Sequence, residues 1–213
     1  MKVGVVDYGV GNLGSVLRAL EELRVSPVLV NRAVDLHACD CLILPGVGNF
    51  ADCARLLQSG GWDTALREEA LGYKRPLLGV CVGMQLLADL SMEGVDSTTN
   101  KAAPGLGLVP GKVEHLRALG CSHRVPHVGW NAINATLSGG LFEGIPDGTD
   151  FYFVHSYAFV ATDSADVIAT TEYGVPITAA VHRGNVWGTQ FHPEKSSRAG
   201  FKLLRNFVSG PVC

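Results

Sequence analysis

The alternation of strand and helix signals over the first ninety residues constrains the fold of this chain more than any other feature. Short apolar runs rich in β-branched residues alternate with segments whose leucines recur at helical spacing. Strands are predicted at 2–7, 27–30, 41–44 and 77–80, and helices at 12–24, 50–71 with a break at Gly60-Gly61, and 84–90. This pattern is typical of βαβ units, which build a parallel sheet covered by helices on both faces.

From about residue 106 the pattern changes to short β-rich runs separated by Gly, Pro, Asn and Asp. These runs are 107–113, 127–133, 151–159, 166–171, 177–182 and 186–191, and only 198–208 has helical spacing. Segment 91–104 is predicted to be an irregular loop. We therefore expect one α/β domain over residues 1–213, in which a doubly wound, mostly parallel half continues without a linker into a more antiparallel half.

Composition excludes several classes of function. A net charge of −3 and a pI near 6.1 do not suit a protein that binds nucleic acid or an anionic membrane. The sequence has no signal-peptide pattern and no apolar run of ~18 residues, so we expect a cytoplasmic protein without a membrane span. The six cysteines lack the spacing of a disulfide framework or a zinc site, so reduced thiols and no metal are expected.

The strongest local signal is Gly79-Val80-Cys81-Val82-Gly83, which follows an apolar strand and precedes a helical segment. This is the pattern of a nucleophile elbow, a tight strand-to-helix turn on which glycines avoid a clash where the chain doubles back. The turn would expose the Cys81 sulfur at the carboxyl edge of the sheet, where α/β folds bind their ligands. A buried structural cysteine remains the alternative interpretation of the pentapeptide alone.

A histidine and a carboxylate near the C-terminus could activate this thiol. His192-Pro193-Glu194 follows a predicted strand, and residues two apart in an extended segment point to the same side. His192 could then take the thiol proton while Glu194 holds its other ring nitrogen. By itself the tripeptide could be an exposed turn, but together with an elbow cysteine it favours a Cys–His–Glu triad.

Acyl transfer also needs donors for an oxyanion, which two backbone N–H groups can supply. The N–H of Val82, directly after the candidate nucleophile, is one expected donor. The loop containing Val47 and Gly48, between a strand end and a helix, is the expected source of the other. Alone, this loop could be an ordinary turn.

One glycine-rich string points to different chemistry. Residues 9–14 match the G-x-G-x-x-G pattern of dinucleotide-binding proteins and stand between a strand and a helix. The second strand lacks the acidic residue that would bind a ribose, although Arg32 could suit a 2′-phosphate. A dinucleotide enzyme would not require the elbow cysteine and its His-Pro-Glu, so no cofactor is predicted.

The elbow with Gln85 and the Phe-His192-Pro-Glu194 string resembles the triad-type, class I glutamine amidotransferases. Further strings at 7–13, 45–50, 126–131, 152–157 and 194–196 resemble, more narrowly, the glutaminase subunits of imidazole glycerol phosphate synthases. The resemblance covers residues 7 to 196, and its departures are small, such as Val128 where this family commonly carries Met. It implies a flavodoxin-like, doubly wound fold.

The resemblance also implies residue roles. Cys81 would attack the glutamine amide to give a glutamyl thioester and ammonia, with His192 as proton carrier oriented by Glu194. Glutamine and its oxyanion would be held by Val47, Gly48, Val82, Gln85, Ser156 and Tyr157. Ammonia would pass to a (β/α)8 cyclase subunit of a heterodimeric synthase in histidine biosynthesis. The residues implied at the partner face are Tyr8, Asn12, Trp130, Asn131, Tyr152 and Lys195.

Three alternatives stay open on the sequence. The chain could be the glutaminase of another amidotransferase, an elbow-cysteine hydrolase of the wider α/β class, or a binding module that has lost its activity. All three triad residues are present, which argues against the last. The glycines around Val47 would permit a peptide reorientation, so we also expect the isolated chain to be nearly inactive without its partner.

Overall fold

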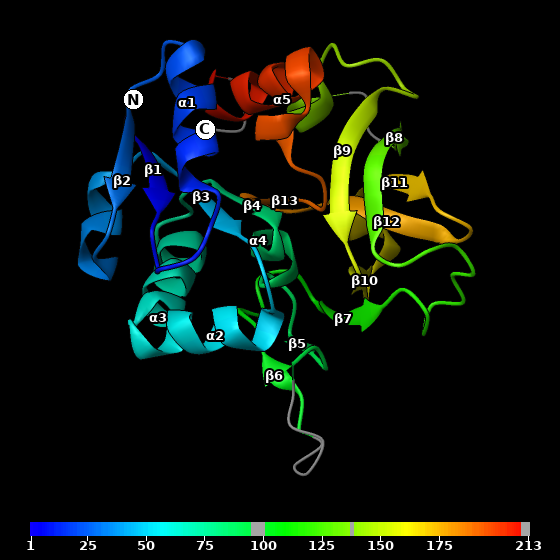
Figure 1. Ribbon diagram of the computed structural model, residues 1–213. Helices are drawn as coiled ribbons and strands as arrows, with labels where there is room; N and C mark the ends of the chain where they lie inside the picture. Colours follow the sequence, from blue (N-terminus) through cyan, green and yellow to red (C-terminus); the bar gives the residue numbers. More distant parts are fainter. Residues whose placement is uncertain (95–100, 137–138, 210–213) are drawn as a thin grey trace.

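The computed structural model describes residues 1–94, 101–136 and 139–209. A nine-stranded sheet runs through the molecule in the order β2-β1-β3-β4-β13-β12-β11-β8-β9 (Figure 1). The parallel part consists of β2 (Pro27–Val30), β1 (Val3–Val6), β3 (Cys41–Gly46), β4 (Leu77–Cys81) and β13 (Val186–Thr189). The antiparallel part consists of β12 (Pro176–Arg183), β11 (Val167–Glu172), β8 (His127–Ala135) and β9 (Asp150–His155). The predicted change from parallel to antiparallel pairing is confirmed.

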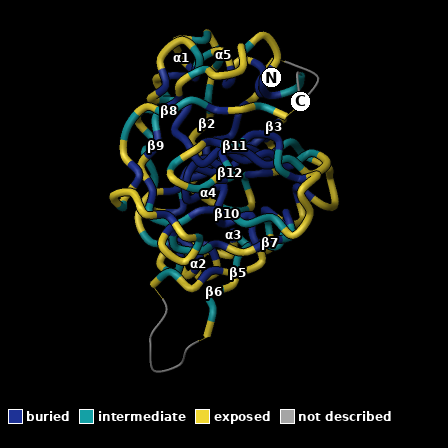
Figure 2. Tube along the Cα trace, turned by 90° about the vertical axis from the view of Figure 1, so that its right-hand side faces the viewer, coloured by how far each residue is buried: buried dark blue, intermediate teal, exposed yellow. Residues whose placement is uncertain are grey.

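Helices cover both faces of the parallel strands. α1 (Leu13–Glu22) and α5 (Ser197–Ser209) lie on one side, and α2 (Phe50–Ser59) and α3 (Trp62–Arg67) lie on the other (Figures 1 and 2). Strands β1, β3, β4 and β13 are buried along their whole length, as expected for strands packed on both faces. Among the described residues, no helix is long and apolar enough to cross a membrane.

Shorter helical turns complete the connections. They are the 3₁₀ turns Ala33–Ala38, Gly140–Phe142, Ser164–Asp166 and Pro193–Lys195, and a π-helical turn at Glu68–Gly72 that follows α3. The predicted break at Gly60-Gly61 is confirmed, because Gly61 adopts a φ of +68° that separates α2 from α3. Such a positive φ is easily reached only by glycine.

A second, four-stranded sheet corrects two sequence predictions. Its order is β10 (Tyr157–Ala161), β7 (Gly111–His115), β5 (Leu90–Ser91) and β6 (Ala103–Pro104). The predicted strand 151–159 is therefore two strands, β9 and β10, which separate at Ser156 and join different sheets. The ends of the predicted loop 91–104 pair with each other as β5 and β6, while residues 95–100 of that loop lie outside the described residues.

The predicted helix 84–90 is also wrong in extent, because α4 spans only Val82–Gln85. The backbone carbonyls of Leu86, Leu87 and Ala88 accept hydrogen bonds from the N–H groups of residues 106, 108 and 107, respectively. A continuing helix would use those carbonyls itself. The tertiary contact with 106–108 therefore ends the helix early.

Candidate active site

Three neighbouring parallel strands end at the same edge of the large sheet. In the register, Gly46 at the end of β3 pairs with Cys81 at the end of β4, and Thr189 at the end of β13 pairs with Val80. The central strand thus delivers Cys81, and its two neighbours deliver the 46–48 loop and the segment that carries His192. The carboxyl edge of a parallel sheet is where α/β folds place their ligand sites.

The turn at Cys81 is held by close backbone contacts. Cys81 adopts a φ of 57° and a ψ of −114°, a left-handed conformation that costs a non-glycine residue about 1–3 kcal/mol. A Cβ atom on Gly79 would lie 2.5 Å from the carbonyl oxygen of Gly83, and one on Gly83 would lie 1.9 Å from that of Leu44. Both flanking glycines are therefore required, for the reason predicted from the sequence.

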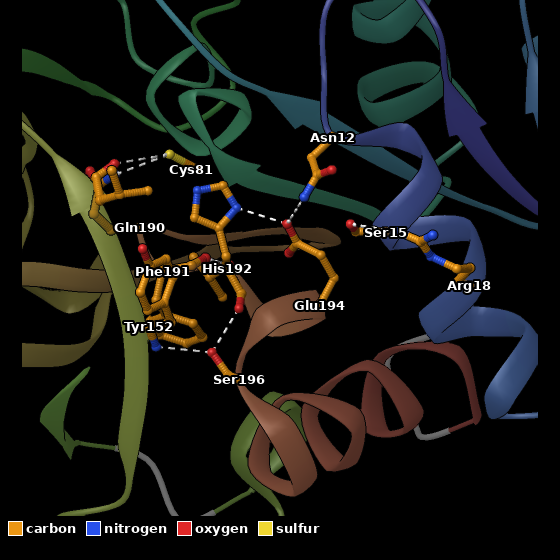
Figure 3. A network of polar contacts seen from close by, with 12 residues as sticks. Asn12, Ser15, Arg18, Cys81, Tyr152, Gln190, Phe191, His192, Glu194 and Ser196 are labelled. Carbon is orange, nitrogen blue, oxygen red and sulfur yellow. Dashed lines mark hydrogen bonds and ion pairs between the residues drawn. The ribbon is translucent and has the colours of Figure 1, made fainter. Parts of the chain in front are cut away.

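His192 and Glu194 form a buried pair beside Cys81. The His192 Nδ1 atom lies 2.8 Å from Glu194 Oε1, and the two side chains are 2% and 1% exposed. The other ring nitrogen faces the Cys81 sulfur (Figure 3). Burial alone would lower the pKa of His192, but its contacts with Cys81 and Glu194 outweigh burial and raise that pKa to about 9. With this pKa, the imidazole ring of His192 is protonated at neutral pH.

Asn12 contacts this pair from the glycine-rich string. Its side-chain Nδ2 donates to Glu194 Oε1 at 3.3 Å, while Glu194 Oε2 has no hydrogen-bond partner within the described part of the chain (Figure 3). The glycine-rich string at 9–14 therefore places the Asn12 side chain beside the candidate triad. The two residues are 182 positions apart, and no sequence pattern links them.

The remaining predicted site residues meet in one cavity of about 170 Å³. Its lining includes Val47, Gly48, Cys81, Val82, Gln85, Ser156, Tyr157 and His192, together with three residues that were not predicted to bind substrate, Glu93, Val154 and His155. The Glu93 carboxylate accepts a hydrogen bond from the backbone N–H of Phe50 at 3.0 Å, and burial raises its pKa. A lone glutamate in an irregular segment carries no sequence signal.

Two buried glutamines connect the cavity wall to the candidate nucleophile. Gln85 Nε2 donates to the carbonyl oxygen of Tyr157 at 2.9 Å and to Gln190 Oε1 at 3.0 Å. Gln190 Nε2 in turn lies 3.9 Å from the Cys81 sulfur (Figure 3). Both side chains are almost completely buried, so these bonds fix their orientation.

The loop expected to form the oxyanion hole is anchored by a thiol. Cys53 Sγ donates to the carbonyl oxygen of Val47 at 3.4 Å. In a trans peptide the next N–H, that of Gly48, points the opposite way, away from Cys53. Gly48 has a φ of +92°, which glycine adopts readily.

The predicted partner-face residues divide into two groups. Trp130, Tyr152 and Lys195 lie together, with Trp130 54% exposed, its ring centroid 6.1 Å from that of Tyr152, and the Lys195 nitrogen 5.9 Å from the Tyr152 ring. Val128 and Val154 are cross-strand partners on the same side and are also exposed. We call these five residues the aromatic face.

The other predicted partner-face residues make contacts within the chain. Tyr8 is only 5% exposed, and burial together with Cys53 and Cys81 raises the pKa of its hydroxyl. The Tyr8 side chain is therefore an interior group and does not belong to an open surface. Asn12 is bonded to Glu194, and Asn131 lies on the opposite side of β8 from Trp130, where its Nδ2 donates to the carbonyl oxygen of Glu172 at 2.9 Å.

Comparison with known proteins shows which family shares this arrangement. The family model for class-I glutamine amidotransferases matches residues 4–210. Two proteins named imidazole glycerol phosphate synthase subunit HisH, from Moorella thermoacetica and Rhodospirillum rubrum, are each 46% identical to this chain. The matches cover 96% of this chain and 93% of the first protein, and 98% of both chains for the second. The chain belongs to the class-I glutamine amidotransferases, in the HisH subunit family.

Solved structures share the fold at much lower sequence identity, among them one described as a glutamine amidotransferase, with a TM-score of 0.73 at 23% identity over 97% of this chain and 96% of that chain. The structure of PurLQS from Thermotoga maritima superposes with a TM-score of 0.73 at 19% identity, over 97% of each chain. Membership of this family sets aside the dinucleotide-binding and general hydrolase interpretations. Within the described ranges, no three His, Cys, Asp or Glu side chains come together in a way that could hold a metal ion.

Proposed function

We propose that this glutamine amidotransferase hydrolyses glutamine to glutamate and ammonia, with Cys81 as the nucleophile, and supplies the ammonia to a (β/α)8 cyclase subunit of imidazole glycerol phosphate synthase in histidine biosynthesis. The observation that carries the proposal is the placement of Cys81, on its constrained turn, beside the buried His192–Glu194 pair at one cavity. The 46% sequence identity to HisH subunits over nearly the whole chain supports the cyclase subunit as the acceptor of the ammonia. The proposed setting is the cytoplasm.

In the first half of the reaction, the Cys81 thiolate attacks the carboxamide carbon of glutamine. The negative charge that develops on the amide oxygen would be stabilised by the N–H groups of Val82 and of the 46–48 loop. His192, which holds a proton at neutral pH because of its raised pKa, gives that proton to the departing nitrogen. The carbon–nitrogen bond breaks, and ammonia and a glutamyl thioester result.

In the second half, water cleaves the thioester. His192 takes a proton from the attacking water, the carbon–sulfur bond breaks, and glutamate and the Cys81 thiolate are released. Glu194 holds the Nδ1–H of the ring throughout, so Nε2 always faces the reacting atoms. The backbone around Ser156 and Tyr157, with Gln85, would hold the substrate. The Glu93 carboxylate lines the same cavity and would bind the α-ammonium group of the substrate.

The aromatic face is the surface we propose for the cyclase subunit. It carries exposed apolar and aromatic side chains, and aromatic residues are enriched at protein–protein interfaces. The backbone N–H of His192 donates to the carbonyl oxygen of Tyr152 at 2.9 Å. A partner bound at Tyr152 would therefore touch a residue that is directly bonded to the candidate triad.

Glutamine hydrolysis by the isolated chain and by a mixture with a cyclase subunit and its nucleotide substrate tests this proposal. We expect slow hydrolysis alone and fast hydrolysis in the mixture, with no activity for Cys81→Ala in either. The matched control is Cys39→Ala, which removes another buried thiol that does not line the cavity and leaves the nucleophile in place. Equal rates for wild type and Cys81→Ala would refute the assignment of the nucleophile.

A further inference from the structure

Two buried histidines lie next to each other at one wall of the cavity. His127 and His155 are cross-strand partners on β8 and β9, and they are only 2% and 6% exposed. His127 Nδ1 lies 2.9 Å from His155 Nε2. His155 lines the cavity, whereas His127 is stacked between the rings of Phe153 and Tyr173.

The two ends of this pair determine where each proton lies. His155 Nδ1 is 2.8 Å from the backbone oxygen of Tyr157, which can only accept, so Nδ1 carries the hydrogen. At the other end, Asn131 Nδ2 lies 3.3 Å from His127 Nε2 and also donates to the Glu172 carbonyl, so it is a donor and Nε2 accepts. A neutral ring has one hydrogen, so His127 Nδ1–H must donate to His155 Nε2.

Both rings are therefore neutral and both are protonated on Nδ1. Burial lowers the pKa of His127 to about 4, and burial is also the main reason why that of His155 falls to about 3. Protonating His155 would set two N–H groups against each other at 2.9 Å, and protonating His127 would set its Nε2–H against the Asn131 amide at 3.3 Å. The nearby charge of His192 lowers the pKa of His155 further.

The same chain of bonds continues to the candidate nucleophile. The Tyr157 carbonyl accepts from His155 and also from Gln85, which binds Gln190, whose amide lies against the Cys81 sulfur. The carbonyl thus links the histidine pair to the Gln85 amide. If the histidine pair shifted, the cavity wall at Ser156 and Tyr157 would move with it, and so would the Gln85 amide.

We infer that His127 and His155 are positioning residues, a neutral imidazole pair that holds the Tyr157 carbonyl and the Gln85 amide in place for glutamine. This inference rests on the proposed function, since it concerns binding of that substrate. In this role, neither imidazole ring exchanges a proton with glutamine. The pair sets the geometry of the cavity wall through directed hydrogen bonds, so its effect falls mainly on substrate binding.

Two substitutions of His127 separate hydrogen bonding from packing. His127→Phe keeps a ring between Phe153 and Tyr173 and removes both nitrogens, whereas His127→Asn keeps a donor at the place of Nδ1 and loses the ring. In the complex with the cyclase subunit, we expect His127→Phe to raise the KM for glutamine about tenfold, which corresponds to one hydrogen bond, with kcat changed less than about threefold. His127→Asn should stay within about threefold of the wild-type KM.

The KM values of the two variants, compared with each other, separate an effect of hydrogen bonding from an effect of packing. A wild-type KM for His127→Phe, or a larger KM for His127→Asn than for His127→Phe, would show that only packing counts and would overturn the inference. A wild-type complex without glutaminase activity would instead refute the proposed function.

A measurement on the wild-type chain needs neither a variant nor activity. Nitrogen-15 NMR of the imidazole side chains at pH 7 should show His127 and His155 neutral and protonated on Nδ1, although the Nε2–H form is the usual one for a free neutral histidine. An Nε2–H or doubly protonated ring at either position would overturn the inference. This readout keeps the inference testable if His127→Phe fails to fold.

Discussion

The ends of the parallel strands and the antiparallel strand β9 lie on two sides of the cavity, and the two regions contribute to it in different ways. On the parallel side, backbone contacts fix the site: Gly79 and Gly83 leave no room for a side chain, and Cys81 is held in a left-handed conformation. On the antiparallel side, side chains alternate between the aromatic face and a hydrogen-bonded interior that contains His127 and His155.

This difference has a physical consequence for how each side responds to change. Close packing of backbone against backbone cannot yield, so a small substitution in the elbow should disrupt the fold locally. A network of side-chain hydrogen bonds can be altered one bond at a time, and each bond is worth about 0.5–1.5 kcal/mol. We therefore expect the parallel side to supply the reactive geometry and the antiparallel side to adjust substrate and partner binding.

The largest expected effect is on the parallel side, at Glu194. Glu194→Gln removes the charge that helps to raise the pKa of His192, so the imidazole should lose its proton at a lower pH. We expect kcat in the complex to fall by about 10²-fold or more, because the ring also loses its orientation. Since the protonated ring serves the leaving ammonia, the alkaline limb of the pH–rate profile should move from about 9 to lower pH. An unchanged profile would contradict this role.

A glycine substitution tests the rigidity of the elbow. Gly83→Ala would place a Cβ atom 1.9 Å from the carbonyl oxygen of Leu44, so we expect the free energy of unfolding to fall by at least about 2 kcal/mol. The matched control is Gly14→Ala in α1, where an added Cβ meets nothing within 4 Å. That change should be neutral or stabilise by up to about 1 kcal/mol. Equal stabilities of the two variants in urea titrations would show that the elbow tolerates a side chain.

The smallest expected effect on the reaction itself comes from the aromatic face. Trp130→Ala should weaken binding of the cyclase subunit by about 1–3 kcal/mol and leave the fold unchanged. Leu29→Ala is the control, because Leu29 is also exposed, at 43%, but lies on β2 at the other end of the sheet. Isothermal titration calorimetry measures both. Equal affinities for the two variants would place the partner elsewhere.

Much of this arrangement could be predicted from the sequence because it depends on local geometry. The elbow glycines, the spacing of His192 and Glu194, and the parallel-to-antiparallel change all follow from short-range patterns. The features that the sequence did not reveal depend on contacts between distant segments. Tyr8 packs into the main hydrophobic core, α4 ends where the N–H groups of 106–108 bond the carbonyls of 86–88, and Asn12 contacts Glu194, which is 182 residues away in the sequence. Glu93 lacks any pattern that would have indicated it.

The central claim is that Cys81 is the nucleophile that attacks glutamine, and covalent labelling tests it most directly. A glutamine analogue that carries an electrophile in place of the amide is incubated with the complex, and the modified residue is identified by mass spectrometry of peptides. We predict one adduct on Cys81, no adduct on Cys81→Ala, and protection of Cys81 by excess glutamine. Labelling of another cysteine, or undiminished labelling of Cys81→Ala, would contradict the account.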